Sequence, residues 1–408
     1  MRILYADAVD VRSTASIVEA GHSIDARPEL TSETLVEAIE GYEVLVVRST
    51  KVTAEAIASS DALGLIVRAG AGTDNIDRDA ASARGIYVCN VPGRNAIAVA
   101  ELTLGLILAL DRRIPDNTAD LRDGQWDKKS YTKADGVYGK QIGIIGVGDI
   151  GLAVAQRAKA FGMTVVAQRK ADRSAATLSA IRSVGIRLLD SLDEVIMTSD
   201  VVSLHVPKAE ETATMVNRSF LDKMKDGGYL INTARGDLVD EDALLEALDT
   251  GRVRAGLDVW NHEPGSGQDR FESPLARHPG VVGTHHIGAS TQQAQRSIAD
   301  GTLEAIEAYL AGSPVNCVNI VSQPSGKACL TIRHLDRVGV LAQVFGVLRS
   351  NGLNVQQMQN LVFEGGYAAV ASIYVSDDVD NSAVEALTEI DEVLNITVIP
   401  STVEAPSR

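Results

Sequence analysis

Three residues with side chains suited to acid–base and anion chemistry follow short apolar runs in the middle of the chain. They are Arg235, Glu263 and His286, and each comes just after a run of strand length. The runs span residues 229–232, 255–259 and 281–283. In an open parallel sheet, the carboxyl ends of the strands meet at one edge, where ligands bind. The sequence therefore predicts that the three side chains gather there.

Together these side chains supply what hydride transfer between a 2-hydroxy acid and a 2-oxo acid requires. The guanidinium of Arg235 would grip a carboxylate with two hydrogen bonds and polarise the oxo group. The imidazole of His286 would donate or accept the hydroxyl proton near neutral pH. The carboxylate of Glu263 would fix the tautomer of that imidazole and favour its charged form.

Each residue also has a simpler interpretation. A lone arginine after a strand is usually a solvated or ion-paired surface residue, and a lone loop histidine is mostly structural. His285 stands beside His286 and is an alternative for the acid–base role. His262, His285 and His286 match no ligand spacing of a helix or turn, so we expect no metal site.

The stretch Gln141–Lys170 would hold a cofactor at this edge. An apolar run at 142–145 leads into a GxGxxG turn, Gly146–Gly151, followed by helical spacing through Phe161 and a second run at 163–167. This strand–turn–helix–strand order makes the glycine motif a dinucleotide site. Gly146 permits the tight turn, Gly148 lets a pyrophosphate approach, and the helix N-terminus offers N–H groups to phosphate.

Further strands and helices place this unit between two others. Residues 1–95 alternate apolar runs with helical patterns, which predicts a parallel sheet, and residues 96–110 and 291–311 form apolar-striped helices. Residues 322–326 indicate a linker, and the order βαββαβ after residue 328 predicts a ferredoxin-like unit.

Composition excludes several function classes. A net charge of −16 argues against a nucleic-acid partner, because the phosphate backbone demands a basic surface. The three cysteines fit a reducing, cytoplasmic compartment with buried thiols, and the N-terminus indicates a strand rather than a signal peptide. The most apolar run, 96–110, is too short to span a bilayer.

Several stretches together resemble the D-2-hydroxyacid dehydrogenase family, and within it the branch that oxidises 3-phosphoglycerate. They are RAGAGTDNID (68–77), NAIAVAELTLGLILAL (95–110), GKQIGIIGVGDIG (139–151), KMKDGGYLINTARG (223–236), LDVWNHEP (257–264) and HIGAST (286–291). Residues 328–400 resemble an ACT domain, a small module that binds amino acids.

The resemblance implies a fold and a set of domain boundaries. The fold is α/β, with a doubly wound parallel-sheet (Rossmann) cofactor domain, a flavodoxin-like substrate domain and a C-terminal ferredoxin-like (ACT) α+β domain. The substrate domain would be 1–95 completed by 288–312, the dinucleotide-binding domain 96–287, the linker 313–327 and the regulatory domain 328–403.

The resemblance also implies site residues. Arg235, Glu263 and His286 match the family's catalytic set, and Asp258 matches the aspartate that holds the nicotinamide carboxamide. The expected substrate contacts are Arg48, Arg68, Gly70, Ala71, Gly72, Arg235 and His286. The expected cofactor contacts are Gly146, Gly148, Asp149, Ile150, Arg169, His205, Val206, Pro207, Thr212, Thr233, Arg235, Asp258 and His286. An amino-acid effector would meet His334, Asp336 and Asn354.

The sequence departs from the family pattern at four places. The segment 48–53 is one residue shorter than usual, and His285 replaces a common proline. Asp336 and Val338 stand where effector-binding members often carry Asn and Pro. Arg169 replaces the acid that accepts the ribose 2′-hydroxyl, which favours acceptance of NADP beside NAD. A solvated basic loop that leaves NAD acceptable is the alternative.

The expected activity is oxidation of 3-phosphoglycerate to 3-phosphohydroxypyruvate in serine biosynthesis, with NAD or NADP as cofactor. A glyoxylate or hydroxypyruvate reductase of the same family is an alternative. From a different class, a nicotinamide-sensing, corepressor-like binding protein is a third. We expect a homodimer or homotetramer, a possible amino-acid effector, no nucleic-acid partner and no membrane partner.

Overall fold

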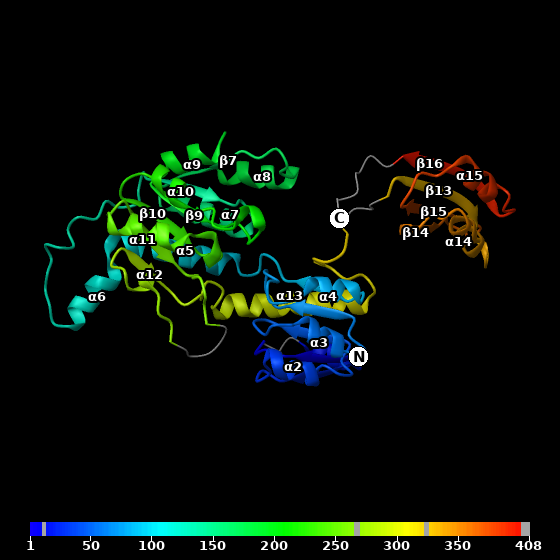
Figure 1. Cartoon of the computed structure of the whole chain (residues 1–408), viewed down its shortest axis with the longest axis horizontal. Coiled ribbons are helices and arrows are strands. Elements are labelled where there is room, and N and C mark those ends of the chain that lie inside the picture. The colour runs from blue at the N-terminus through cyan, green and yellow to red at the C-terminus, as the bar shows by residue number, and fades with distance from the viewer. Residues whose placement is uncertain (10–13, 265–269, 322–325, 401–408) are drawn as a thin grey trace. The chain divides into compact units, whose positions relative to one another are not determined.

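The computed structural model describes residues 1–9, 14–264, 270–321 and 326–400 (Figure 1). The chain forms two compact units, Met1–Asn319 and Ile320–Arg408. The first unit holds two parallel sheets and the second holds one antiparallel sheet. Residues 322–325 of the predicted linker and 401–403 of the predicted last domain lie outside the described residues.

The first sheet has five parallel strands in the order β2-β1-β3-β4-β5, which is the flavodoxin-like order. The strands are β1 (Arg2–Tyr5), β2 (Ser23–Ala26), β3 (Val44–Val47), β4 (Leu65–Arg68) and β5 (Tyr87–Asn90). The inner strands are apolar at nearly every position because both faces of the sheet are covered.

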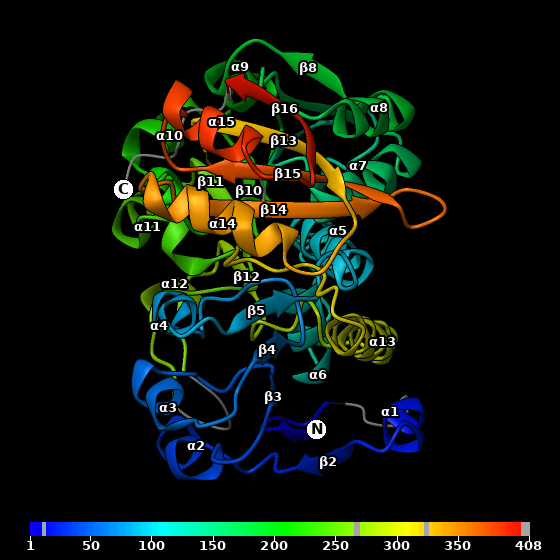
Figure 2. The same cartoon turned by 90° about the vertical axis from the view of Figure 1, so that its right-hand side faces the viewer.

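Helices cover both faces of this sheet (Figure 2). The chain supplies α1 (Ala15–Glu19), α2 (Ser32–Ala38), α3 (Ala54–Ser59), α4 (Arg78–Ala83) and, much later, α13 (Gln292–Leu310). Leu4, Leu45 and Ile66 face α2, α3 and α4. Their neighbours in the strands point the other way, where α13 contributes Ile298 and Ile306 to the core.

The second sheet has seven parallel strands in the order β12-β11-β10-β9-β6-β7-β8. The strands are β6 (Gln141–Ile145), β7 (Thr164–Gln168), β8 (Arg187–Leu189), β9 (Val201–Leu204), β10 (Gly228–Asn232), β11 (Val253–Leu257) and β12 (Val281–Gly283). The order reverses between β6 and β9, as in doubly wound dinucleotide-binding sheets. The predicted parallel-sheet cofactor fold is confirmed.

The helices around the second sheet also form two layers. One core contains side chains of α5 (Ala96–Arg112), α7 (Asp149–Ala160) and α8 (Ala175–Val184). The other contains side chains of α9 (Leu192–Thr198), α10 (Arg218–Lys223), α11 (Glu241–Asp249) and α12 (Pro274–Arg277). The remaining helical segments are α6 (Ile114–Arg122), η2 (Glu210–Thr212) and η3 (Gly236–Leu238).

We call the five-stranded sheet with its helices the first lobe, and the seven-stranded sheet with its helices the second lobe. The chain passes from β5 into α5 and so enters the second lobe, and it returns to the first through α13. Residues 316–319 then run along β5 as a short antiparallel strap. The predicted boundaries at residues 95 and 287 stay predictions.

The second unit is an antiparallel sheet covered on one face by two helices. Its elements are β13 (Ala328–Leu335), α14 (Val340–Ser350), β14 (Val355–Val362), β15 (Ala368–Val375), α15 (Asn381–Thr388) and β16 (Val393–Pro400). The order β14-β15-β13-β16 with antiparallel pairing is ferredoxin-like, as predicted.

Two details differ from the sequence-based expectation. Phe161, expected on the apolar stripe of the helix after the glycine turn, lies one residue beyond α7 and is 43% exposed. Strands β2 and β8 were not expected, because each is a short edge strand with little apolar pattern. In the part of the chain that the structure describes, no helix is both long enough and apolar enough to span a bilayer.

Candidate active site

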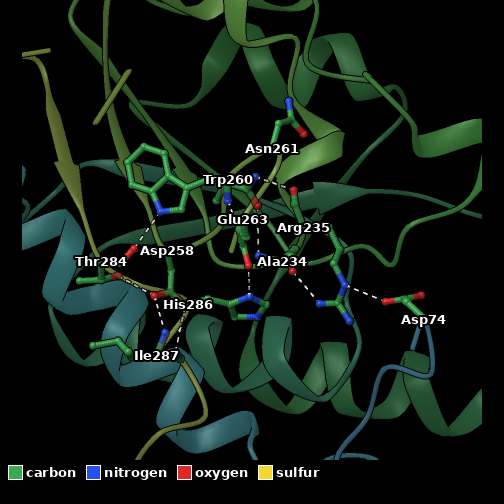
Figure 3. A network of polar contacts seen from close by, with 12 residues as sticks. Asp74, Ala234, Arg235, Asp258, Trp260, Asn261, Glu263, Thr284, His286 and Ile287 are labelled. Atoms are coloured by element: carbon green, nitrogen blue, oxygen red, sulfur yellow. Dashed lines mark hydrogen bonds and ion pairs between the residues drawn. The ribbon is translucent and has the colours of Figure 1, made fainter. Parts of the chain in front are cut away.

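The loop after β12 brings His286 against Glu263 from the loop after β11 (Figure 3). His286 Nδ1 lies 2.7 Å from Glu263 Oε2, and Glu263 Oε1 accepts the backbone N–H of Trp260 at 2.7 Å. A carboxylate can only accept, so Nδ1 carries the proton and Nε2 remains available to exchange one with a ligand. The imidazole is half exposed, whereas Glu263 is more deeply placed behind it.

The environment of Glu263 favours its charged form. Burial raises its pKa, but the hydrogen bonds from His286 and from Trp260 N–H, together with the charges of His286 and Arg235, outweigh burial. The net pKa of Glu263 therefore lies below its usual value, and the group is an anion at neutral pH.

Asp258, the residue directly after β11, fixes the loop that carries His286. Its carboxylate accepts the Thr284 hydroxyl at 2.6 Å and the backbone N–H groups of Ile287 and Gly288, each at 2.8 Å. Its own carbonyl accepts the N–H of His286 at 2.7 Å. These bonds hold His286 in the left-handed region, with φ of 51°, a conformation that a non-glycine residue adopts rarely.

Arg235 lies opposite this pair, on the loop after β10. The buried Asn232 shapes that loop by donating to the Arg235 carbonyl at 2.8 Å and accepting from Ala234 N–H at 3.0 Å. Arg235 Nη1 donates to the Ala234 carbonyl at 2.7 Å, and Nε donates to Asp74 Oδ2 at 3.0 Å. Asp74 belongs to the first lobe, so this ion pair joins the lobes within the first unit (Figure 3).

The glycine loop after β4 closes around two guanidinium groups. A side chain at Gly70 would begin 1.7 Å from Arg68 Nη1, and one at Gly72 would begin 2.1 Å from Arg235 Nη2. Asn90 donates to the Ala71 carbonyl at 2.6 Å and holds the loop in place. A side chain at either position would displace the neighbouring guanidinium, and Gly70 also has a φ of 145°, which favours glycine.

Three positive side chains thus converge at the boundary of the lobes. Burial, reinforced by the charges of Arg235 and Arg48, lowers the pKa of Arg68 to about 10, and Arg68 Nε is buried without a hydrogen-bond partner. Asp7 accepts the backbone N–H groups of residues 48, 49 and 50 and so fixes the turn that carries Arg48. Such a cluster suits a ligand with more than one anionic group.

The Gly146–Gly151 turn has the shape that a dinucleotide requires. A side chain at Gly146 would meet the His205 carbonyl at 2.3 Å, and one at Gly151 would meet the Gly146 carbonyl at 2.1 Å. By contrast, nothing lies within 4 Å of the Gly148 position, which leaves space above the start of α7. No side chain caps α7, so its first N–H groups remain free for phosphate. Asp149 and Ile150 begin this helix.

The loop after β9 faces the same turn. His205 Nε2 lies 2.9 Å from Ser203 Oγ, while Nδ1 is buried without a partner. Burial lowers the pKa of His205 to about 3, so the ring is neutral. Thr212 donates to the Pro207 carbonyl at 2.8 Å and closes the turn that follows Val206. Thr233 packs beneath, 3.1 Å from the Thr103 hydroxyl.

Arg169 stands just beyond β7, where the ribose 2′-position is expected. Its Nε donates to Asp190 at 3.2 Å, and both side chains are largely exposed, at 61% and 88%. Such a solvated pair contributes little and is easily exchanged for another anion. Arg173, four residues on, has a buried Nη1 without a partner, and burial lowers its pKa.

The sequence left open two alternatives for the histidines, namely His285 as the acid–base group and a metal site. His285 is exposed, whereas His286 contacts Glu263, which favours His286 for the acid–base role. Among the described residues, no three His, Cys, Asp or Glu side chains converge as a metal site would require.

The three predicted effector residues do not converge within one copy of the second unit. His334 is buried, with its ring nitrogens 2.8 Å from the Leu335 carbonyl and 3.2 Å from Asn360 Oδ1. Asp336 precedes α14 and Asn354 follows it, and both are exposed. A helix of eleven residues separates them by about 16 Å.

Comparison with known proteins supplies the family. Residues 104–288 match the NAD-binding domain of the D-isomer specific 2-hydroxyacid dehydrogenases. The hydroxypyruvate reductase of Thermotoga maritima is 41% identical over 307 residues, which cover 75% of this chain and 97% of that protein. The chain belongs to the D-2-hydroxyacid dehydrogenase family.

Longer members of this family match as well. The D-3-phosphoglycerate dehydrogenase of Methanocaldococcus jannaschii is 40% identical over 333 residues, 80% of this chain. The match spans 62% of that relative, and 60% of the corresponding enzyme of Archaeoglobus fulgidus, so the chain spans about six tenths of their length.

Solved structures of enzymes that are 28% identical to this chain share its fold. D-lactate dehydrogenase from Aquifex aeolicus, with NAD and lactic acid, has a TM-score of 0.67 and 28% identity and covers 79% of this chain and 100% of its own. An acyclic imino acid reductase, with NADPH and D-arginine, has a TM-score of 0.69 and 28% identity over 78% and 100% of the two chains.

Two contributions to this dehydrogenase site escaped the sequence analysis. Asp74 was not expected beside Arg235, and Asp258 was expected only at the nicotinamide, not as the anchor of the His286 loop. A carboxylate within the motif GTDNID, two residues after the glycine loop, was the available signal for Asp74.

Proposed function

We propose that the chain oxidises 3-phosphoglycerate to 3-phosphohydroxypyruvate in serine biosynthesis, with NAD or NADP as the hydride acceptor. The observation that carries this choice is the convergence of Arg48, Arg68 and Arg235 at the boundary of the lobes. A simple 2-hydroxy acid carries one carboxylate, which Arg235 alone can hold. A phosphorylated substrate adds an anion that gives the two further arginines a partner.

The chain's own residues divide the chemistry among them. Arg235 binds the substrate carboxylate through the guanidinium edge that Asp74 leaves free, and it polarises the developing oxo group. His286 Nε2 accepts the hydroxyl proton, and Glu263 stabilises the imidazolium that forms. The bound nicotinamide ring supplies the site that takes up the hydride. The Gly146–Gly151 turn would carry the pyrophosphate of that cofactor.

The experiment is a comparison of substrates on matched variants. We expect kcat/KM for 3-phosphoglycerate to exceed that for D-glycerate or D-lactate by about 10²-fold or more, since charge-assisted hydrogen bonds to phosphate contribute about 1.5–3 kcal/mol each. Arg48→Met should remove about 10²-fold of this preference and leave the unphosphorylated acids unchanged. Arg235→Met serves as the internal control, because it should impair every substrate.

Either of two results would reject the phosphorylated substrate. One is a panel in which hydroxypyruvate or glyoxylate is reduced with a higher kcat/KM than phosphohydroxypyruvate, which would support the reductase alternative. The other is the absence of turnover with intact nicotinamide binding, which would support a sensing protein. Retention of the full catalytic set favours chemistry over sensing.

We further propose that Arg169 permits use of NADP. The support is its solvated partner Asp190, which a 2′-phosphate can displace, and the unpartnered Nη1 of Arg173 nearby in sequence. Arg169→Asp should lower affinity for NADP and spare or improve NAD, with Arg182→Asp on α8 as a matched control. Equal kcat/KM with NAD and with NADP in the Arg169→Asp variant would reject this role.

For the second unit, we propose an amino-acid effector site shared between two copies of the chain in a homodimer or homotetramer. Asp336 and Asn354 lie at opposite ends of α14, so one copy does not bring them together. Calorimetry with serine and glycine tests this, with Asp336→Ala as the variant. No heat with any amino acid would leave the unit as an assembly module only.

A further inference from the structure

Cys89 in β5 faces Cys317 in the strap, residues 316–319, that lies along this strand. The strap runs antiparallel to the strand, with Asn90 N–H bonded to the Asn316 carbonyl at 3.1 Å and Val318 N–H bonded to the Val88 carbonyl at 2.8 Å. Cys89 and Cys317 pair between these two bonds. This is the non-hydrogen-bonded position of an antiparallel pair, where side chains approach most closely.

The two sulfurs are within reach of each other in the thiol form. Cys89 Sγ lies 3.1 Å from Cys317 Sγ. Cα atoms in such a pair are about 4.5 Å apart, at the short end of the range that disulfides adopt. The sulfurs would have to approach by about 1 Å to reach the bonded distance of about 2.05 Å. The third cysteine, Cys329, lies in β13 of the second unit.

We propose that Cys89 and Cys317 form a reversible disulfide when the protein meets a hydroperoxide. The half-buried Cys317 reacts first, because Cys89 is fully buried in the first lobe. Its sulfur attacks the peroxide oxygen, which breaks the O–O bond and leaves a sulfenic acid and one water. Cys89 sulfur then attacks Cys317 sulfur, and the hydroxyl group leaves with the Cys89 proton as a second water.

The reaction balances without a further partner. Two thiols lose two electrons and two protons, and hydrogen peroxide gains both to become two waters. Burial, followed by the hydrogen bond with Cys317, raises the pKa of the Cys89 thiol, which is consistent with Cys89 as the second rather than the first sulfur to react. A small thiol reductant reverses the bond by exchange at Cys317.

The location gives the bond a structural effect on the substrate loop. Asn90, the residue after Cys89, donates to the Ala71 carbonyl, and Val91 N–H donates to the Gly70 carbonyl at 2.9 Å. On the other side, Asn319 already ties the strap to Val88 N–H and to the Ile86 carbonyl. The disulfide would therefore clamp the strap to β5 immediately before the residues that support the glycine loop. It would also join positions 228 residues apart in sequence.

The test uses the purified full chain, treated with hydrogen peroxide and then denatured for thiol counting. We expect reactive thiols to fall from three to one, the intact mass to fall by about 2 Da, and a peptide pair joining residues 89 and 317 to appear. Dithiothreitol should restore all three thiols. The oxidised protein should melt higher by about 5 °C or more, because the bond closes a long loop.

Cys329→Ser is the matched control, since it leaves both strap cysteines in place and should still form the bond. Cys317→Ser should abolish the bond and leave Cys89 unoxidised. If Cys317→Ser fails to fold, the thiol count of Cys329→Ser, from two to none, still decides the question. The proposal would be overturned if the parent chain kept three thiols after peroxide treatment. It would also be overturned by a mass gain of about 32 Da, from sulfinic acid at Cys317, without the joined peptides.

Discussion

Replacing Glu263 by glutamine removes the charge behind His286 and preserves the side-chain shape. The carboxylate and imidazole touch at 2.7 Å, which places their charge centres about 4 Å apart. At an effective dielectric constant of about 20, such a pair is worth about 4 kcal/mol. His286 is 50% exposed, so solvent screening reduces this to about 2 kcal/mol. That energy corresponds to a loss of about 30-fold in rate.

The backbone adds a second loss to that of the charge. Trp260 N–H donates to Glu263 Oε1, so in the variant it will hold the amide oxygen on its own side. The amide NH₂ then faces His286 Nδ1 and selects the tautomer protonated at Nε2. In that tautomer Nε2 already carries a proton, so it cannot accept the hydroxyl proton of the substrate. We therefore expect a further loss of about 10-fold, shared by both directions of the reaction because the equilibrium constant fixes the ratio of their kcat/KM values.

Steady-state kinetics in both directions between pH 5 and 9 would test this reasoning. We expect a loss of kcat/KM in both directions at every pH in this range, because the charge behind His286 and the correct tautomer are both removed. Glu241→Gln is the matched control, since Glu241 accepts Asn261 N–H at 2.9 Å in the same loop region without contacting His286. A loss of kcat/KM under about 3-fold would refute the argument.

Three further predictions concern other parts of the site and fold. Gly72→Ala should push Arg235 aside and lower kcat/KM by about 10- to 100-fold with unchanged cofactor binding. The control is Gly105→Ala, whose added methyl group would meet nothing within 4 Å and should leave the stability of the fold unchanged or slightly raised. Asp74→Ala should free the Arg235 guanidinium and raise KM by about 3- to 10-fold; a fall in KM would mean that Asp74 competes with substrate. Burial raises the pKa of Asp200, but Gln141 N–H and Lys225 outweigh it, so the folded pKa is lowered. The stabilisation that the charged Asp200 gives the folded state is thus present above its unfolded pKa of about 3.9 and is lost as pH falls through the folded pKa. In urea titrations, Asp200→Asn should therefore lower the free energy of unfolding at pH 7 but not near pH 2.

The inner strands could be predicted from sequence because burial on both faces makes them continuous apolar runs. Val44–Val47 is buried at all four positions, and its run was plain in the sequence. The edge strands carry no such signal: Ser23–Ala26 is half exposed, and Arg187–Leu189 has only three residues. Their place in the sheets depends on tertiary pairing with β1 and β7, which local pattern does not encode.

The meeting of Arg235, Glu263 and His286 followed from the rule that parallel strands present their carboxyl ends at one edge. The contact between Asp74 and Arg235 could not, because it joins residues 161 positions apart in different lobes. The anchoring role of Asp258 depends on the backbone conformation of the loop after β12, including the left-handed His286. Spacing alone does not reveal which backbone N–H groups a buried carboxylate will meet.

The late return of α13 to the first lobe has a consequence for folding during synthesis. Ile3, Tyr5 and Val46 in the first strands pack against Ile298, Ala305 and Ile306. The part of this sheet face that α1 does not cover therefore stays bare until residue 310 has been made. At about 5–20 residues per second, the ribosome needs roughly 10–40 s to pass from β5 to the end of α13. The second lobe, built entirely from residues in between, can close during that interval. The lobe that emerges first is therefore the one that finishes last, and chaperone binding to its exposed strands is expected to persist until α13 docks.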